Sequence, residues 1–203
     1  MLFRSGRFRP RCWRYNVANN EGGTGLNFAS AGDPRVMVCV GGSAACRAIQ
    51  VPQTRRDDLL EPLNVQMRWM ARESEVAMLR GQEARLIEAE ASLAADPTGA
   101  GALALINQAR ATEAGLAPLA DAGSPAARVD QLFRERAFWN FGIGARVGDM
   151  RRLVRQYGRA ANTVFPTGAW HKGGDYGEDV NFPIPQAEEN NPNAGGGCMD
   201  RNA

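Results

Sequence analysis

Residues 131–153 read QLFRERAFWNFGIGARVGDMRRL, and this stretch sets aromatic rings among charged side chains before a Gly-x-Gly turn. Ser124 and Pro125 predict a helix start just upstream, because serine accepts an amide hydrogen bond and proline fits the first helical turn. We expect this helix to continue to about Phe141. Its inward face is expected to consist of Val129, Leu132, Phe133, Arg136, Ala137, Asn140 and Phe141.

Another helix is expected after Gly142 and Gly144, which break the preceding one. It begins near Ala145 and can end at Gly158, because glycine readily adopts the left-handed conformation that closes a helix. Its apolar stripe is expected to consist of Val147, Met150, Leu153, Val154 and Tyr157. The stretch therefore predicts two helices joined by a tight corner.

Two more helices are predicted upstream of this corner. The sequence QEARLIEAEASLAAD, from Gln82 to Asp96, consists of strong helix formers and stops at an Asp-Pro pair. Residues 101–115, GALALINQARATEAG, follow with Leu103 and Ile106 facing inward. Because the link between them is short, the two helices should be antiparallel neighbours. The expected apolar face of the first consists of Leu86, Ile87, Ala91, Leu93 and Ala94.

The rest of the chain has little helical periodicity. Residues 1–18 are basic and are expected to be disordered, and residues 19–80 should be irregular, with one short β-like run at 36–40. Residues 81–159 form the predicted helical core. Residues 160–203, dense in glycine, asparagine and proline, are expected to form an irregular tail. The fold class that follows is mainly α.

Length and composition restrict the class of protein. The chain has 203 residues, of which 44% are hydrophobic and 23% charged, with a formal net charge of +2. These values are ordinary for a globular protein with a substantial core. No apolar run reaches the roughly eighteen residues that predict a transmembrane helix. The first fifteen residues are arginine-rich and lack the apolar core of a secretory signal.

Charged residues fall on faces of the predicted helices that should be buried. Arg136 lies on an inward face, and Glu90 and Arg146 lie on or beside others. Buried charges are normally paired, so we expect ion pairs between helices. The hypothesis is that the corner is held by a polar cluster of Glu135, Arg136, Arg146 and Asp149. A catalytic role for Glu90 is not favoured, since no histidine, serine or cysteine partner is recognisable.

The four cysteines give no zinc-binding pattern. Cys39 and Cys46 bracket the sequence VGGSAA, and a local disulfide there is plausible in an oxidising compartment. Both thiols could equally be free. Cys12 and Cys198 lie near opposite ends of the chain and could pair or stay free.

A glycine-rich loop in the tail contains weak candidates for ligand binding. Trp170, His171 and Tyr176 lie close together in AWHKGGDYG. Exposed aromatic rings can stack on sugars or bases, but they can also fix a loop onto the helices. His171 is the only histidine and has no neighbouring ligand set, so no metal site is expected. No cofactor is expected either.

Four segments together resemble SusD/RagB-type nutrient-uptake outer-membrane proteins. The residues around the corner are similar to the family pattern E-R-x-x-x-x-F-G-x-G-x-R-x-x-D-L-x-R; they are Glu135-Arg136, Phe141-Gly142, Gly144-x-Arg146 and Asp149-Met150-x-Arg152. The other three segments are EARLIEAEASL, ALINQARATEAGL and FPIPQAEENNPN. Trp139 and Ile143 depart from the family, which often has glutamate at these positions. The resemblance spans residues 82–193.

The resemblance implies a surface-exposed lipoprotein without catalytic activity. Members bind a glycan or another nutrient over a TonB-dependent transporter in the outer membrane and help deliver the ligand to it. Their fold consists of tetratricopeptide-like helix pairs that support long irregular loops, and a lipid anchor holds them on the membrane. By this comparison, residues 19–203 form a partial domain that matches only the C-terminal portion of longer family members, and this chain is expected to be a truncated member.

Two other interpretations remain open from the residues themselves. The helix pairs could form an intracellular helical-repeat module that binds another protein. The arginine-rich N-terminus and the face with Arg152, Arg155 and Arg159 could bind nucleic acid instead, although the near-neutral net charge does not favour this.

Overall fold

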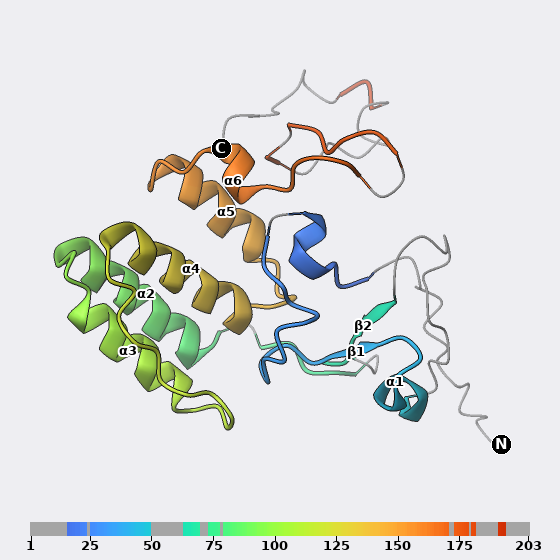
Figure 1. Cartoon of the computed structure of the whole chain (residues 1–203), viewed down its shortest axis with the longest axis horizontal. Helices are drawn as coiled ribbons and strands as arrows, with labels where there is room; N and C mark the ends of the chain where they lie inside the picture. Colours follow the sequence, from blue (N-terminus) through green and yellow to red (C-terminus); the bar gives the residue numbers. More distant parts are fainter. Residues whose placement is uncertain are drawn as a thin grey trace.

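Helices dominate the regular structure of this computed structural model, which confirms the mainly α class (Figure 1). The structure describes residues 16–23, 25–49, 63–69, 73–77, 79–170, 173–178, 180–181 and 191–193. The expectations for the N-terminal arm, for Cys12 and Cys198 and for His171 lie outside these residues.

No helix in the described part of the chain is long and apolar enough to cross a membrane.

Helices α2 (Gly81–Ala95) and α3 (Ala100–Arg110) pack side by side, and α4 (Pro125–Trp139) lies against α2 (Figure 1). Their interface is the largest apolar cluster among the residues that the structure describes. Its buried members are Leu86, Ala89, Leu93, Ala102, Ile106, Ala109, Leu132 and Trp139.

The expected apolar face of α2 was partly wrong. Leu86 and Leu93 are buried as predicted, but Ile87 is 57% exposed, and Ala91 and Ala94 are also exposed. Successive residues of a helix are rotated by about 100°. Because α3 and α4 cover the side that carries Leu86, Ala89 and Leu93, the neighbouring positions point to solvent.

Helix α4 is the centre of the fold. The Ser124 side chain caps its start by accepting from the Ala127 amide at 3.2 Å, and Pro125 is its first residue. The helix ends at Trp139, two positions before the predicted end at Phe141. Its last turn is buried on all sides, because α2 covers one side and a segment around Phe28 covers another. The second side is an apolar cluster of Phe28, Val36, Ala137 and Phe138.

The corner after α4 depends on glycine. Gly142 and Gly144 have φ of 75° and 85°, a region that residues with a Cβ rarely adopt. A Cβ at Gly142 would also collide with the Trp69 ring, whereas one at Gly144 would meet nothing. Helix α5 (Arg146–Arg155) follows, and the short α6 (Ala161–Val164) packs on α5 (Figure 1).

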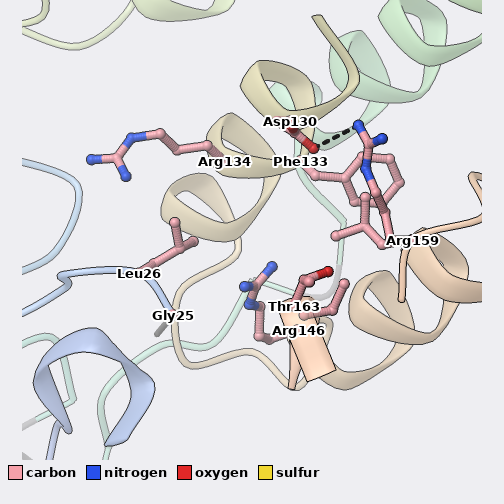
Figure 2. A pocket seen from close by; sticks show the side chains of 10 residues that line it. Gly25, Leu26, Asp130, Phe133, Arg134, Arg146, Arg159 and Thr163 are labelled. Carbon is pink, nitrogen blue, oxygen red and sulfur yellow. Dashed lines mark hydrogen bonds and ion pairs between the residues drawn. The ribbon is translucent and has the colours of Figure 1, made fainter. Parts of the chain in front are cut away.

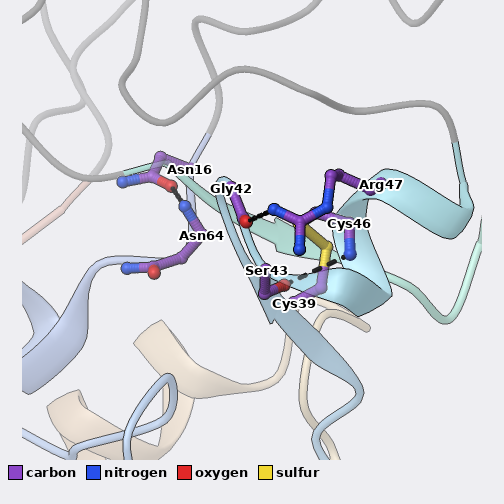
Figure 3. Close-up of a disulfide and its surroundings, with 7 residues drawn as sticks. All are labelled: Asn16, Cys39, Gly42, Ser43, Cys46, Arg47 and Asn64. Atoms are coloured by element: carbon purple, nitrogen blue, oxygen red, sulfur yellow. Dashed lines mark hydrogen bonds between the residues drawn. A yellow bond between two sulfur atoms is a disulfide. The ribbon is translucent and has the colours of Figure 1, made fainter.

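A small β unit lies beside this helical layer. Strand β1 (Val38–Val40) pairs antiparallel with β2 (Asn64–Gln66), with Cys39 opposite Val65. Helix α1 (Ala44–Ala48) follows β1 in a region that the sequence predicted to be irregular. Cys39 and Cys46 form a disulfide that joins β1 to α1 (Figure 3). Both cysteines are buried with Leu63 in a third apolar cluster.

Candidate functional site

Glu135 is a buried carboxylate shared by two arginines. Arg35 Nη1 donates to its Oε2 at 2.6 Å, and Arg110 Nη1 donates to its Oε1 at 2.7 Å. Arg35 Nη2 also donates to Asp33 Oδ2 at 2.6 Å. Burial alone would raise the pKa of Asp33, but the hydrogen bonds from Arg35 lower it overall. The arrangement fixes the segment around Arg35 against α3 and α4.

Arg136 binds Asp149 across the Gly-x-Gly corner. Nε donates to both carboxylate oxygens at 3.1 and 3.0 Å, and Nη2 donates to Oδ1 at 2.9 Å. Arg152 Nη1 also donates to Oδ1 at 3.3 Å. These buried hydrogen bonds connect α4 to α5.

Glu90 joins α2 to α5. It accepts hydrogen bonds from Arg152 and, at 2.6 Å, from the Tyr157 hydroxyl. Burial alone would raise the pKa of Glu90, but these two donors lower it overall. Burial and the bond to Glu90 raise the pKa of Tyr157 to about 12. Both donors occupy the same carboxylate oxygen, and a carboxylate of lowered pKa is a weaker base, so the arrangement favours a structural role for Glu90.

Arg146 pairs with a residue far upstream. Its Nε and Nη2 donate to the two carboxylate oxygens of Glu21 at 2.6 and 2.8 Å. Glu21 Oε2 also accepts from the Leu26 amide at 2.9 Å. Glu21 and its neighbour Asn20 have φ of 50° and 53°, so this turn has a strained backbone that the Arg146 fork holds in place.

The four residues expected to form one polar cluster at the corner are divided among three separate networks. Only Arg136 and Asp149 form an ion pair at the corner. Glu135 pairs with Arg35, and Arg146 pairs with Glu21. The physical reason is helical geometry. Adjacent residues such as Glu135 and Arg136 point about 100° apart, so they serve different neighbours.

The sequence did not single out several partners in these networks. Arg35 and Glu21 lie 100 and 125 residues from the groups they bind. No local pattern identifies such partners, because a single sequence gives no indication of long-range pairing. Tyr157 was predicted only as a member of its helix, and Arg110 only as a member of its helix and of the family-like segment ALINQARATEAGL. Arg152 was part of the family-like pattern, and that pattern was the one signal that could have found it.

A cavity of about 760 Å³ lies between the end of α5, α6 and the loop that follows. Its lining combines rings and aliphatic groups with an amide, a hydroxyl and a carboxylate. The lining residues are Val154, Ala161, Asn162, Phe165, Pro166, Thr167, Tyr176, Gly177, Glu178 and Val180. Cavities of this size and mixed chemistry are typical of sites for small molecules.

The candidate residues of the aromatic loop divide around this cavity. Ala169 and Asp175 form an isolated antiparallel bridge, and the Tyr176 amide donates to Gly168 O at 2.9 Å. Tyr176 lines the cavity. Trp170 sits in the turn, 39% exposed, and is not part of the lining. The loop therefore presents one aromatic ring to the cavity and another nearer to solvent.

In the residues that the structure describes, no group of His, Cys, Asp and Glu side chains could hold a metal ion. Comparison of the chain with protein-family models found no match. Comparisons with curated proteins and with solved structures found none either.

Proposed function

We propose that the protein binds a glycan or a similar polar nutrient, without catalysis, at the outer-membrane surface and passes it to a TonB-dependent transporter. The observation that carries the proposal is the cavity of about 760 Å³ beside α6. Phe165 and Tyr176 are the aromatic residues of its lining, and Asn162, Thr167 and Glu178 are polar ones. Sugars need both kinds of contact, since each pyranose has apolar C–H faces and hydroxyl edges.

The family-like pattern supports the same proposal through its structural role. Its charged members Glu135, Arg136, Arg146, Asp149 and Arg152 are all engaged in ion pairs. Such a pattern maintains a scaffold instead of performing chemistry, as expected for a binding protein that resembles the SusD/RagB family. The close packing of α2 on α3 is compatible with the tetratricopeptide-like pairing that we propose for this scaffold.

The disulfide supports the proposed location. Disulfides persist in oxidising compartments such as the periplasm and the cell surface and are rare in the cytosol. The Cys39–Cys46 bridge closes a short loop, and the Ser43 side chain accepts from the Cys46 amide at 3.2 Å next to it (Figure 3). A membrane anchor, by analogy with the family, would be a lipid.

Glycan-array binding followed by titration calorimetry tests the proposed function. We expect the full chain to bind a neutral oligosaccharide. Tyr176→Ala should weaken that binding about tenfold or more, because the sugar loses the aromatic ring on which it stacks. Trp170→Ala tests whether the outer ring takes part. Ile87→Ala, on the exposed face of α2, is the matched control and should bind normally.

Two results would reject the proposal. One is a folded chain that binds no glycan on the array. The other is binding that Tyr176→Ala leaves unchanged, since the ligand would then lie elsewhere.

A helical-repeat interaction module is the second candidate, because apolar side chains are exposed near α2. Leu79 and Ile87 are 91% and 57% exposed. Exposed apolar groups on and beside a helix can mark a protein-binding surface. The Ile87→Ala control also tests this alternative, since loss of a captured protein partner in that variant would favour it.

A further inference from the structure

The two cavities that border α6 differ in the charge of their linings. Three arginines belong to the lining of a smaller cavity of about 310 Å³ (Figure 2); they are Arg134, Arg146 and Arg159. The larger cavity, of about 760 Å³, has no arginine or lysine in the lining that the structure describes. The one charged residue in that lining is Glu178. The larger cavity therefore has a negative charge that its own lining does not balance.

Two arginines of the smaller cavity already have carboxylate partners of their own. Arg146 donates to both carboxylate oxygens of Glu21. Arg159 Nη2 donates to Asp130 Oδ1 at 2.9 Å, and Figure 2 shows this pair on the side of α4. Neither arginine is paired with Glu178, so these cations do not neutralise the larger cavity.

Helix α5 also carries arginines close to the larger cavity in sequence. Arg151 and Arg155 precede and follow a residue of its lining, but neither belongs to the lining. Arg151 Nη1 donates to the backbone oxygen of Val180 at 3.5 Å, and Arg155 is exposed to solvent. Because both act from outside the lining, Glu178 places its charge closest to a bound ligand.

The Glu178 side chain is open to a ligand. The residue is exposed, and it forms no hydrogen bond or ion pair with the residues that the structure describes. A carboxylate without a protein partner can accept charge-assisted hydrogen bonds from a cationic group, which are stronger than those from a neutral hydroxyl.

The negative charge also acts across much of the cavity. A sphere of 760 Å³ has a radius of roughly 6 Å, which is shorter than the Debye length of about 8 Å at physiological ionic strength. Salt therefore does not fully screen the attraction between Glu178 and a cation near the middle of the cavity. A direct contact adds to this attraction but is not needed for it.

The charge of the whole molecule acts in the opposite direction. The formal net charge of the chain is +2, which favours anionic ligands over cationic ones at long range. A preference for cationic ligands would therefore have to come from the cavity.

We propose that the larger cavity selects glycans that carry a protonated amine, that is, amino sugars, and disfavours glycans that carry a carboxylate or a sulfate. This inference rests on the proposed glycan-binding function and adds the class of glycan to it. The aromatic residues Phe165 and Tyr176 suit the apolar face of any pyranose, so they do not discriminate by charge. Glu178 does, because it attracts an ammonium group and repels an anion.

The glycan array that tests the proposed function can test this preference when it carries matched oligosaccharides. In each set the same backbone bears a hydroxyl, an amine or a carboxylate, as in oligosaccharides of glucose, glucosamine and glucuronic acid with one linkage. Titration calorimetry on the full chain, at a pH where the amine is protonated, then measures the affinities.

We expect the amino form to bind roughly three- to fivefold more tightly than the neutral form, since water partly screens an ion pair at an exposed carboxylate. The carboxylate form should bind more weakly than the neutral form. Added salt should bring the three affinities closer together.

Variants at Glu178 make the test specific. Glu178→Gln should remove the advantage of the amino form over the neutral form, because the attracting charge is lost. Glu178→Lys should reverse the order and favour the carboxylate form. Glu88→Gln removes the same charge from the exposed surface of α2 and is the matched control, which should keep the advantage.

The preference and the proposed function fail in different ways. If no glycan binds, the proposed function is rejected and this inference with it. If neutral glycans bind at least as tightly as their amino forms, or if Glu178→Gln keeps the advantage of the amine, only the preference is overturned. An equal change in Glu88→Gln would assign the effect to the overall charge of the protein and would also overturn the preference.

Discussion

The Arg136 guanidinium and the Asp149 carboxylate meet 13 residues apart across the Gly-x-Gly corner, with 2.9 Å between Nη2 and Oδ1. Their side chains are 7% and 4% exposed. Because both side chains are buried, each charge is stabilised mainly by the other, and the ion pair fixes the angle between α4 and α5. The corner is therefore held by an ion pair as well as by the backbone of its glycines.

Asp149→Asn should destabilise the protein strongly. The substitution keeps the side-chain volume but leaves the Arg136 charge buried without its partner, which costs roughly 3–5 kcal/mol. Urea unfolding measures the change in free energy. The control is Glu88→Gln, which removes an exposed partner of Arg85 and should cost less than about 1 kcal/mol. Similar losses in both variants would show that the buried pair does not stabilise the corner.

Glu135→Gln should loosen a segment that is distant in sequence. Without the carboxylate, the Arg35 and Arg110 guanidiniums lose their shared partner, and the turn from Asp33 to Val36 loses its anchor on α4. Hydrogen exchange should speed up at the Val36 amide, which bonds to Asp33 O at 3.0 Å. The Asp96 amide, which bonds to Ser92 O at the end of α2, is the internal reference. Exchange that increases equally at both amides would indicate global destabilisation instead.

Gly142→Ala should destabilise the protein more than Gly144→Ala. Both alanines would have to adopt a left-handed backbone, at a cost of about 1–2 kcal/mol each. Only the Cβ at Gly142 would also collide with the Trp69 ring. Thermal unfolding compares the two variants, and tryptophan fluorescence should change chiefly in Gly142→Ala. Equal melting temperatures would mean that Trp69 moves away at no cost.

Tyr157 should ionise late in the folded protein. Burial and the hydrogen bond to Glu90 raise its pKa to about 12, and an unfolded tyrosine titrates near 10. The contribution of this hydroxyl to stability is therefore complete below about pH 10 and is lost as the pH rises through 12. The ultraviolet absorbance of tyrosinate should show a component near pH 12 that disappears in Tyr157→Phe. Loss of a component near pH 10 instead would contradict the bond to Glu90.

Local chemistry allowed much of the helical layer to be predicted. Ser124 and Pro125 define the start of α4, since their preferences act within one helical turn. The Asp-Pro pair likewise predicted the end of α2, and the glycines of the corner predicted the break between α4 and α5. The exposure of Ile87 could not be predicted, because the position of a neighbouring helix decides which face of α2 is covered.

The candidate sites were less predictable than the helices. The sequence drew attention to Tyr176 because exposed aromatic rings on a loop can stack on sugars or bases, but the cavity that Tyr176 lines depends on where α6 lies.

By itself, the sequence determined the mainly α class, the Ser124 cap and the glycine corner, because these follow from preferences of residues within a few positions of one another. The tertiary structure alone decided which charges meet. Arg146 bonds to Glu21 and Arg35 to Glu135 across 125 and 100 residues. A buried charge requires an opposite charge but does not specify which one, so the packing of distant segments selects the partner.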